Sequence, residues 1–383
     1  MKSQFLALAT CLAAATYAAP QGGMRPQTCQ KPAGEVGAVF ALTNSPFSND
    51  VVTFSRSSDG RLVQNAIIPT GGLGIGVDFD TQGGLRLSSH NKYLCAVSPA
   101  TDQVSVFSVD GSCLRKIQEI YAGDQPLALS VSPDNKLAYV LDGTVASTGI
   151  FGFTIGSDGT LSPITNETIP TSTPIGVPGT IDFSLDGKSL IVINKVGSSI
   201  DFYSIDAAGA ATLKTTTQSS GERPFGALFR KDGALFVVES GLPVFTNTAI
   251  STYDVDVGSG AISTVSASEK NQQTEGCWIA LAGSNDQFVY TANFVSGKIS
   301  SYAVSADARV TLVDGSAYFA GNGSEPVDLA VAGQGRFLYN LLRGTGAVDA
   351  FAVQDDGSLL SLGRAVEGTG LPRANGVSGM VAF

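Results

Sequence analysis

The chain has 383 residues, a formal net charge of -10 and a pI near 4.6. Nucleic acids and anionic membrane surfaces are bound by basic faces, so this charge argues against both as partners. After the first residues, no apolar run reaches the roughly 20 residues that a membrane span needs. The composition therefore argues against a nucleic-acid-binding protein and against a membrane protein.

The amino terminus has the pattern of a secretory signal peptide. A lysine precedes a short apolar run from Phe5 to Ala15, and small residues follow. This layout predicts cleavage near Ala18. We therefore expect residues 1–18 to be a signal peptide, residues 19–36 to be an amino-terminal tail, and the mature protein to be secreted and extracellular.

Cysteines and glycosylation sequons fit a secreted protein. After removal of the signal peptide an even number of cysteines remains, and secretion permits disulfides. We expect at least one disulfide, and the sequence leaves its pairing open among Cys29, Cys95, Cys113 and Cys277. The sequons at Asn166 and Asn322 predict glycan sites on exposed loops.

The rest of the chain is an internal repeat. An aromatic residue recurs inside alternating apolar segments, with spacings of 53, 46, 50, 50, 49 and 49 residues, at Phe54, Phe107, Phe153, Tyr203, Tyr253, Tyr302 and Phe351. A second pattern, a polar turn followed by an apolar strand, has six copies, among them "SPDNKLAYV" and "SLDGKSLIV". Four short strands in every 45 to 55 residues are typical of a β-propeller blade.

The unequal counts of the two patterns predict how the ring closes. Seven copies of the first pattern against six of the second leave one blade without its innermost strand. The segment 38–44 fits the second strand of that blade, and the carboxy-terminal segment 376–383 fits the missing one. We therefore predict an all-β, seven-bladed propeller over residues 37–383, with four antiparallel strands per blade and few helices.

The single histidine falls in a turn of this repeat. His90 aligns with Asp134, Asp186 and Asp232, between the first and second strands of a blade and far from the channel mouth. A Ser-His-Asp triad or a zinc site with histidine ligands at the mouth is thereby excluded. The glycine-rich run "GGLGIG" at 71–76 has no strand-to-helix context, so we interpret it as a loop between blades.

At this point the sequence resembles the lactonase-type seven-bladed propellers, the family of 6-phosphogluconolactonase and fungal carboxymuconate lactonizing enzyme. The resemblance covers the whole propeller and rests on the blade pattern and on "PFGALFRKDGALFVVESG", "CWIALAGSNDQFVYTANFVSGKISSYAV" and "PVDLAVAGQGRFLYNLLRGTGAVDAFAV". It is closest to a secreted, uncharacterised branch. It implies a lactone-opening or lactone-forming enzyme whose site lies at the channel mouth.

Only some of the catalytic residues that the resemblance implies are present in this sequence. Enzymes of the family carry "GPRH" before one innermost strand and a Glu at the end of the next strand. The first motif maps to residues 223–226, where Phe225 and Gly226 occupy the Arg and His positions. The Glu maps to Gly241, although Glu239 lies two residues earlier, on the same face of a strand.

Charged residues in the mouth-side loops suggest a replacement site. We predict Arg223, Arg343 and Glu239 as catalytic, because arginines can hold a carboxylate and an oxyanion while a carboxylate moves a proton. The predicted substrate-binding residues are Lys195, Glu275, Trp278, Asn293 and Arg373. Packing between blades is the competing interpretation of Trp278.

Two classes of function remain open at this stage. The first is an enzyme that opens or forms a lactone on a small, carboxylated substrate, without a cofactor or bound metal. The second is a secreted binding propeller that has lost the family chemistry. A calcium-dependent lactonase is a third alternative, which needs several oxygen ligands on the axis. We expect a monomer.

Overall fold

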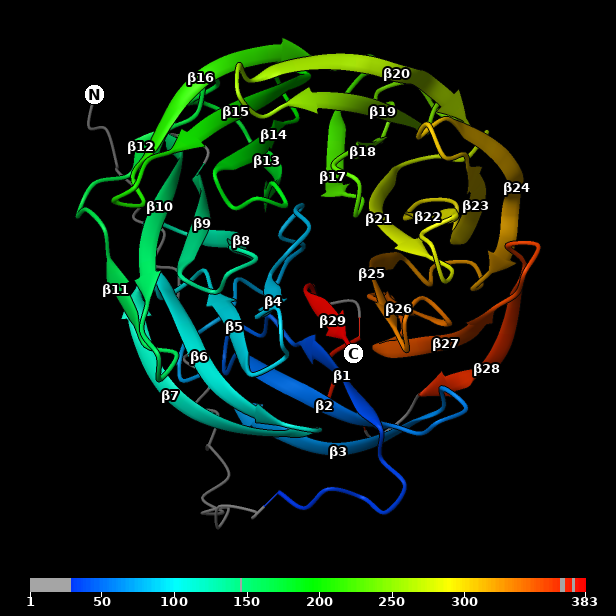
Figure 1. The fold of residues 1–383 in the computed structure, drawn as a ribbon. Coiled ribbons are helices and arrows are strands. Elements are labelled where there is room, and N and C mark those ends of the chain that lie inside the picture. Colours follow the sequence, from blue (N-terminus) through cyan, green and yellow to red (C-terminus); the bar gives the residue numbers. More distant parts are fainter. Residues whose placement is uncertain (1–28, 145–146, 366–368, 374–375) are drawn as a thin grey trace, which may run out of the picture.

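The structure is a computed structural model that describes residues 29–383 except 145–146, 366–368 and 374–375. The predicted signal peptide therefore lies outside the described residues. The chain forms seven antiparallel sheets arranged as a ring of blades around a central channel (Figure 1). The prediction of a seven-bladed, all-β propeller is confirmed.

The first four blades run in chain order around the ring. Blade 1 contains β1 (Gly37–Leu42), β2 (Asp50–Arg56), β3 (Leu62–Pro69) and the carboxy-terminal β29 (Met380–Ala382). Blade 2 contains β4 (Leu85–Leu87), β5 (Tyr93–Ser98), β6 (Gln103–Asp110) and β7 (Cys113–Tyr121). Blade 3 contains β8 (Pro126–Val131), β9 (Leu137–Thr144), β10 (Ser147–Ile155), β11 (Leu161–Pro163) and the short β12 (Ile169–Pro170). Blade 4 contains β13 (Pro178–Phe183), β14 (Ser189–Asn194), β15 (Ser199–Ile205) and β16 (Ala211–Gln218).

The remaining three blades repeat the four-strand unit without extra elements. Blade 5 contains β17 (Pro224–Phe229), β18 (Leu235–Glu239), β19 (Ala249–Asp256) and β20 (Ala261–Lys270). Blade 6 contains β21 (Gly276–Ala282), β22 (Phe288–Asn293), β23 (Lys298–Val304) and β24 (Val310–Phe319). Blade 7 contains β25 (Pro326–Ala332), β26 (Phe337–Leu342), β27 (Ala347–Val353) and β28 (Leu359–Ala365).

Burial explains the sequence pattern of the strands. Second strands such as β14 and β22 are buried along their whole length, because neighbouring blades cover both faces. Outermost strands such as β16 alternate between covered and exposed residues, as expected for a sheet with one solvated face. Tyrosines complete the packing: the hydroxyls of Tyr139, Tyr290 and Tyr339 donate to carbonyls in outer turns of the next blade.

The two ends of the chain close the ring. β29 pairs antiparallel with β1, with Ala382 opposite Val39 and Met380 opposite Ala41. The closing strand is shorter than the predicted segment 376–383, but its partner and its innermost position are as predicted. The Asp328 carboxylate of blade 7 also accepts the Met380 amide at 3.0 Å, which links the closing strand to the last blade.

A disulfide joins the tail to the ring. Cys29 is bonded to Cys113 at the start of β7, so the segment before β1 is held against blade 2. Cys95 and Cys277 are buried free thiols. The expectation of at least one disulfide is confirmed. Within the described ranges, no helix is long and apolar enough to cross a membrane.

Candidate functional site

The connection between blades 1 and 2 crosses the channel at its mouth. Residues 70–84 join β3 to β4, and we call residues 77–82 the crossing segment. The Gln82 amide N–H donates to the carbonyl of Gly179 in blade 4, and its side-chain amide donates to the carbonyl of Ile279 in blade 6. These two blades are separated by blade 5, so the crossing segment spans the channel.

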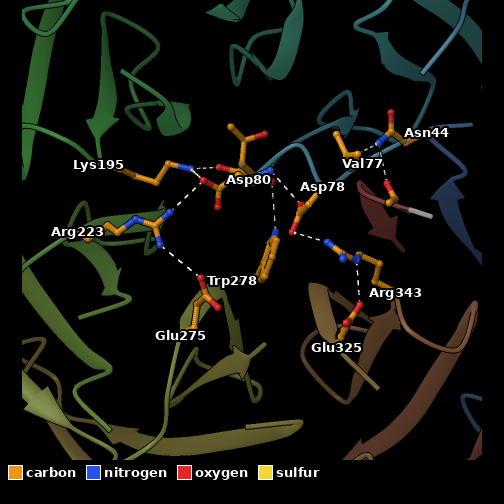
Figure 2. Close-up of polar contacts among 12 residues, drawn as sticks. Asn44, Val77, Asp78, Asp80, Lys195, Arg223, Glu275, Trp278, Glu325 and Arg343 are labelled. Carbon is orange, nitrogen blue, oxygen red and sulfur yellow. Dashed lines mark hydrogen bonds and ion pairs between the residues drawn. The ribbon is translucent and has the colours of Figure 1, made fainter. Parts of the chain in front are cut away.

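The other end of the crossing segment is fixed by Asn44. The Asn44 side-chain amide donates to the Val77 carbonyl at 2.6 Å (Figure 2) and to the Gly376 carbonyl at 2.7 Å. Its Oδ1 accepts the Ile75 amide at 2.9 Å. The glycine-rich run 71–76 is therefore part of the connection between blades, as predicted. It delivers Asp78 and Asp80 to the mouth.

Mouth residues come from two recurring positions of the blade. One is the residue just before an innermost strand, which has left-handed backbone geometry in four blades, at Gln125, Arg223, Glu275 and Glu325. The other follows the last residue of a second strand: Lys195 follows Asn194, Phe294 follows Asn293 and Arg343 follows Leu342. The repeat therefore brings these side chains to one face.

Asp80 is the centre of the first half of the mouth cluster. Its carboxylate lies 2.7 Å from Lys195 Nζ and 3.1 Å from an Arg223 guanidinium nitrogen, and Lys195 also donates to the Asp80 carbonyl (Figure 2). Arg223 also lies 3.5 Å from Glu275. Lys195 is almost fully buried, and the Phe225 ring lies 4.3 Å from its ammonium nitrogen. This half presents two cations, each already paired with a carboxylate.

Arg343 is the centre of the second half. Its Nε lies 2.9 Å from Glu325 and its Nη1 lies 3.5 Å from Asp78, so its two partners come from blade 7 and from the crossing segment. Its guanidinium lies 5.0 Å from the Phe294 ring centroid, within cation–π range. Arg343 therefore reaches across from the ring to the crossing segment.

Burial shifts three ionisable groups of this cluster. Desolvation raises the pKa of Asp78, and the neighbouring Asp80 carboxylate acts in the same direction. Desolvation also raises the pKa of Glu275, against the opposing effect of Arg223. The pKa of Lys195 is lowered because its ammonium is buried, although Asp80 counteracts this. Such shifts bring carboxylates towards the range useful for proton transfer.

Two predicted site residues lie inside their blades. Glu239 is 1% exposed, and its carboxylate accepts hydrogen bonds from the hydroxyls of Ser219, Ser251 and Ser268 and from the Gly221 amide. Asn293 is fully buried and bonds within blade 6, to Ser300 among others. The structure does not bring either residue to Arg223 or Arg343, and the predicted roles of both stay untested.

Trp278 and Arg373 occupy different surroundings. Trp278 is 1% exposed, packs against Phe225 and Phe294 with centroids 5.1 and 6.3 Å away, and donates from its indole to the Thr81 carbonyl. This is the packing between blades that was the competing interpretation. Arg373 is exposed in the connection between β28 and β29.

The crossing segment limits which residue fits at position 226. A Cβ atom on Gly226 would lie 2.1 Å from the side-chain oxygen of Gln82, so no larger residue fits there while Gln82 spans the channel. Phe225 is buried beneath Lys195. Gly226 and Phe225 therefore fit a channel that the crossing segment occupies.

Sequence reasoning missed Asp78 and Asp80. Neither lies in a repeated position, because the crossing segment belongs to one irregular connection. A signal was nevertheless present: the spacing of 53 residues between Phe54 and Phe107 is the longest in the repeat. Extra length between blades, containing two aspartates, indicated a functional loop.

Two cavities flank the mouth region. A pocket of about 520 Å³ lies beside the cluster and is lined by Lys195, Val196, Gly197, Ser198, Gln218, Glu222, Arg223 and Leu242. A channel of about 510 Å³ lies beyond the crossing segment, with Gln82 and Gly83 at one end and Ser89 and Asn91, beside the exposed His90, at the other. His90 therefore lies in the predicted turn, between β4 and β5.

Metal ligands do not converge anywhere in the part of the chain that the structure describes. No group of three or more histidine, cysteine, aspartate or glutamate side chains there could hold a metal ion. The calcium alternative, which also counts amide oxygens as ligands, stays a prediction. The ionised groups at the mouth are instead paired with one another.

The seven sheets and the charged cluster define a seven-bladed β-propeller with a candidate site at the channel mouth. The model of the family "Lactonase, 7-bladed beta-propeller" matches residues 85–241 and 227–328, which together exceed half of the chain. The protein belongs to this lactonase family.

Individual relatives agree with this assignment. A 6-phosphogluconolactonase from Serratia proteamaculans is 24% identical over 270 residues, which are 69% of this chain and 78% of that protein. A Lactobacillus plantarum protein of known structure has a TM-score of 0.72 at 17% identity, covering 91% of this chain and 99% of its own. The Pseudomonas aeruginosa periplasmic gluconolactonase has a TM-score of 0.69 at 15% identity, with 91% and 99% covered. These structural likenesses concern the fold.

Proposed function

We propose that this protein is a secreted lactone hydrolase whose site lies at the channel mouth beside Arg223 and Glu275. Family membership and the curated 6-phosphogluconolactonase relative support the reaction class. The observation that carries the proposal is the pair itself: a partly exposed carboxylate of raised pKa lies 3.5 Å from a guanidinium, close to a pocket of about 520 Å³. Secretion rests on the amino-terminal pattern and is supported by the disulfide.

The pair has the groups that hydrolysis of a lactone needs. A water molecule adds to the lactone carbonyl carbon while Glu275 takes its proton. As Glu275 becomes neutral, the Arg223 N–H group that was paired with it donates a hydrogen bond to the oxyanion that forms. The ring C–O bond then breaks, and the proton passes from Glu275 to the departing ring oxygen. The product is the open hydroxy acid, and water is the only co-reactant.

Glu275 replaces Glu239 as the proposed base because of access. The Glu239 carboxylate is buried under four hydrogen-bond donors, whereas 20% of the Glu275 side chain is exposed. The carboxylated substrate implied by the resemblance is not carried into this proposal, because Arg223 and Arg343 already pair with carboxylates of the chain itself.

The test is a panel of lactones presented to the purified mature protein. Glu275→Gln should lower turnover by roughly 100-fold or more, the usual contribution of a general base. Glu325→Gln is the matched control, since Glu325 occupies the same left-handed position in blade 7. Melting temperatures of both variants separate loss of chemistry from loss of fold. Turnover that survives Glu275→Gln would contradict the assignment.

A binding propeller without catalysis remains the second candidate, and one observation favours it. The three cations Lys195, Arg223 and Arg343 all have carboxylate partners within the chain. If the protein turns over no lactone in the panel but melts at a higher temperature when one of these lactones is present, it binds lactones without hydrolysing them.

A further inference from the structure

The charge of the mouth cluster indicates what kind of ligand it takes. Three cations, Lys195, Arg223 and Arg343, face four carboxylates, Asp78, Asp80, Glu275 and Glu325, in five ion pairs no longer than 3.5 Å. The formal charge of the cluster is therefore 3 − 4 = −1. An anionic ligand would have to displace a carboxylate of the chain before a cation could bind it.

The crossing segment makes this displacement difficult. Asp80 is held by both Lys195 and Arg223, and Lys195 also bonds its main-chain carbonyl. The next residues are fixed as well: the Thr81 hydroxyl donates to Leu127, and Gln82 bonds both Gly179 and Ile279. The chain itself therefore supplies the anion at this place.

The pocket beside the cluster has two apolar residues in an otherwise mostly polar lining. Val196 and Leu242 line it, and 69% of the Val196 residue is exposed. Val244 and Phe245 follow Leu242 in the same loop and are also exposed, at 54% and 69%. We call Val196, Leu242, Val244 and Phe245 the apolar rim. Val244 and Phe245 lie outside the pocket lining, and together with Val196 they place exposed apolar surface beside it, which marks an interaction site.

We infer that the mouth pocket takes an uncharged lactone with an apolar arm, the ring lying towards Arg223 and Glu275 and the arm on the apolar rim. That the ligand is a lactone rests on the proposed function. That it is uncharged rests on the charge balance of the cluster, and that it has an apolar arm rests on the apolar rim. A partner protein on the same rim is the competing occupant. The pocket of about 520 Å³ favours a small ligand, because a flat protein contact requires no cavity.

The experiment uses γ-butyrolactones with unbranched alkyl arms of increasing length. Each added methylene that enters the pocket should strengthen binding about fourfold until the rim is covered, since a buried methylene contributes about 0.8 kcal/mol. The same ring with a carboxymethyl arm is the charged comparison, and it should bind more weakly than an alkyl arm of equal length. Binding is measured by calorimetry and turnover by release of acid.

Matched variants separate the rim from general surface effects. Val196→Ser should weaken binding of the longest alkyl lactone roughly five- to tenfold. Val295→Ser is its control, since Val295 follows Phe294 as Val196 follows Lys195 and is also exposed, but does not line the pocket. Phe245→Ser and Phe47→Ser form a second pair, both exposed phenylalanines in loops after second strands.

The outcomes distinguish this inference from the proposed function. Turnover that prefers the carboxymethyl lactone overturns the inference and leaves the lactonase standing. Binding that rises with arm length and falls in Val196→Ser, without turnover, supports the ligand class and overturns the hydrolase. Binding that is equal for all arms, or unchanged by both rim variants, overturns the inference. A second protein captured only by an intact rim, with no lactone binding, assigns the rim to a protein partner.

Discussion

Neighbouring residues at the end of a second strand meet different surroundings. The residue opposite the start of the innermost strand, which is the last residue of the second strand in blades 4 to 6, points into its own blade. Asp142, Asn194, Glu239 and Asn293 occupy this position, and each bonds a hydroxyl of its own blade. The following residue faces the mouth, as Lys195 and Arg343 do. The inner position is polar in blades 3 to 6 but is Leu342 in blade 7, and the outer position carries Lys195, Phe294 or Arg343.

This comparison changes how a charged residue in such a repeat is interpreted. The sequence predicted Glu239 as catalytic because it lies two residues before the position to which the family glutamate maps. Its register opposite Pro224 places it in the inner position. Glu275 lies at the start of a blade and remains accessible. The end of a second strand therefore holds a framework carboxylate, and the residue before an innermost strand holds the candidate base.

The largest expected effect is on the framework as a whole. Deleting residues 376–383 removes β29 and leaves β1 as a free edge, and it also removes the Met380 amide that Asp328 accepts. We expect loss of cooperative unfolding, measured by calorimetry. A truncated chain that melts like the intact one would show that the ring does not depend on its closing strand.

Glu239→Ala probes the inner position directly. It leaves three hydroxyls and the Gly221 amide without their acceptor in a buried place. We expect a loss of about 4 kcal/mol in the free energy of unfolding. Urea unfolding measures it, with Glu275→Gln as the mouth-side counterpart, which should change stability by about 1 kcal/mol or less. Equal losses in the two variants would remove the distinction between the positions.

Asp142 tests the inner position through pH. Desolvation raises its pKa from 3.8 to about 8, and its Oδ1 is buried without a hydrogen-bond partner. The folded state therefore holds a proton that the unfolded state releases, so stability present at low pH falls as pH rises from about 4 to about 8. Asp142→Asn should reduce this slope by up to about 1.4 kcal/mol per pH unit. The free energies of unfolding of both proteins at pH 6 and pH 8 check this prediction. An equal change between the two pH values in both proteins would contradict it.

The smallest effect is expected at the lone histidine. His90 is exposed in the turn between β4 and β5, far from both positions compared above. His90→Ala should change the free energy of unfolding by less than about 0.5 kcal/mol and leave turnover of any lactone unchanged. A large loss of turnover would place the chemistry at the other end of the channel.

The sequence predicted the ring better than the site, for a physical reason. Blade number and closure follow from patterns that recur every 46 to 53 residues, such as the aromatic series from Phe54 to Phe351. Arg223, Lys195 and Arg343 were found because they occupy loops that the repeat places at the mouth. Asp78 and Asp80 were not found, because their position depends on how Gln82 bonds blades 4 and 6, and no repeat encodes that contact.

The crossing segment also has a mechanical consequence. In a ring whose blades touch only their neighbours, small tilts can add up around the circumference and make the opening oval. Gln82 connects the edges of blades 4 and 6 directly, and Asp78 and Asn44 extend that connection to blades 7 and 1. The width of the opening is thus fixed by contacts across the channel as well as by contacts between neighbouring blades. Distances across the mouth should therefore fluctuate less than distances between the outer strands of the blades.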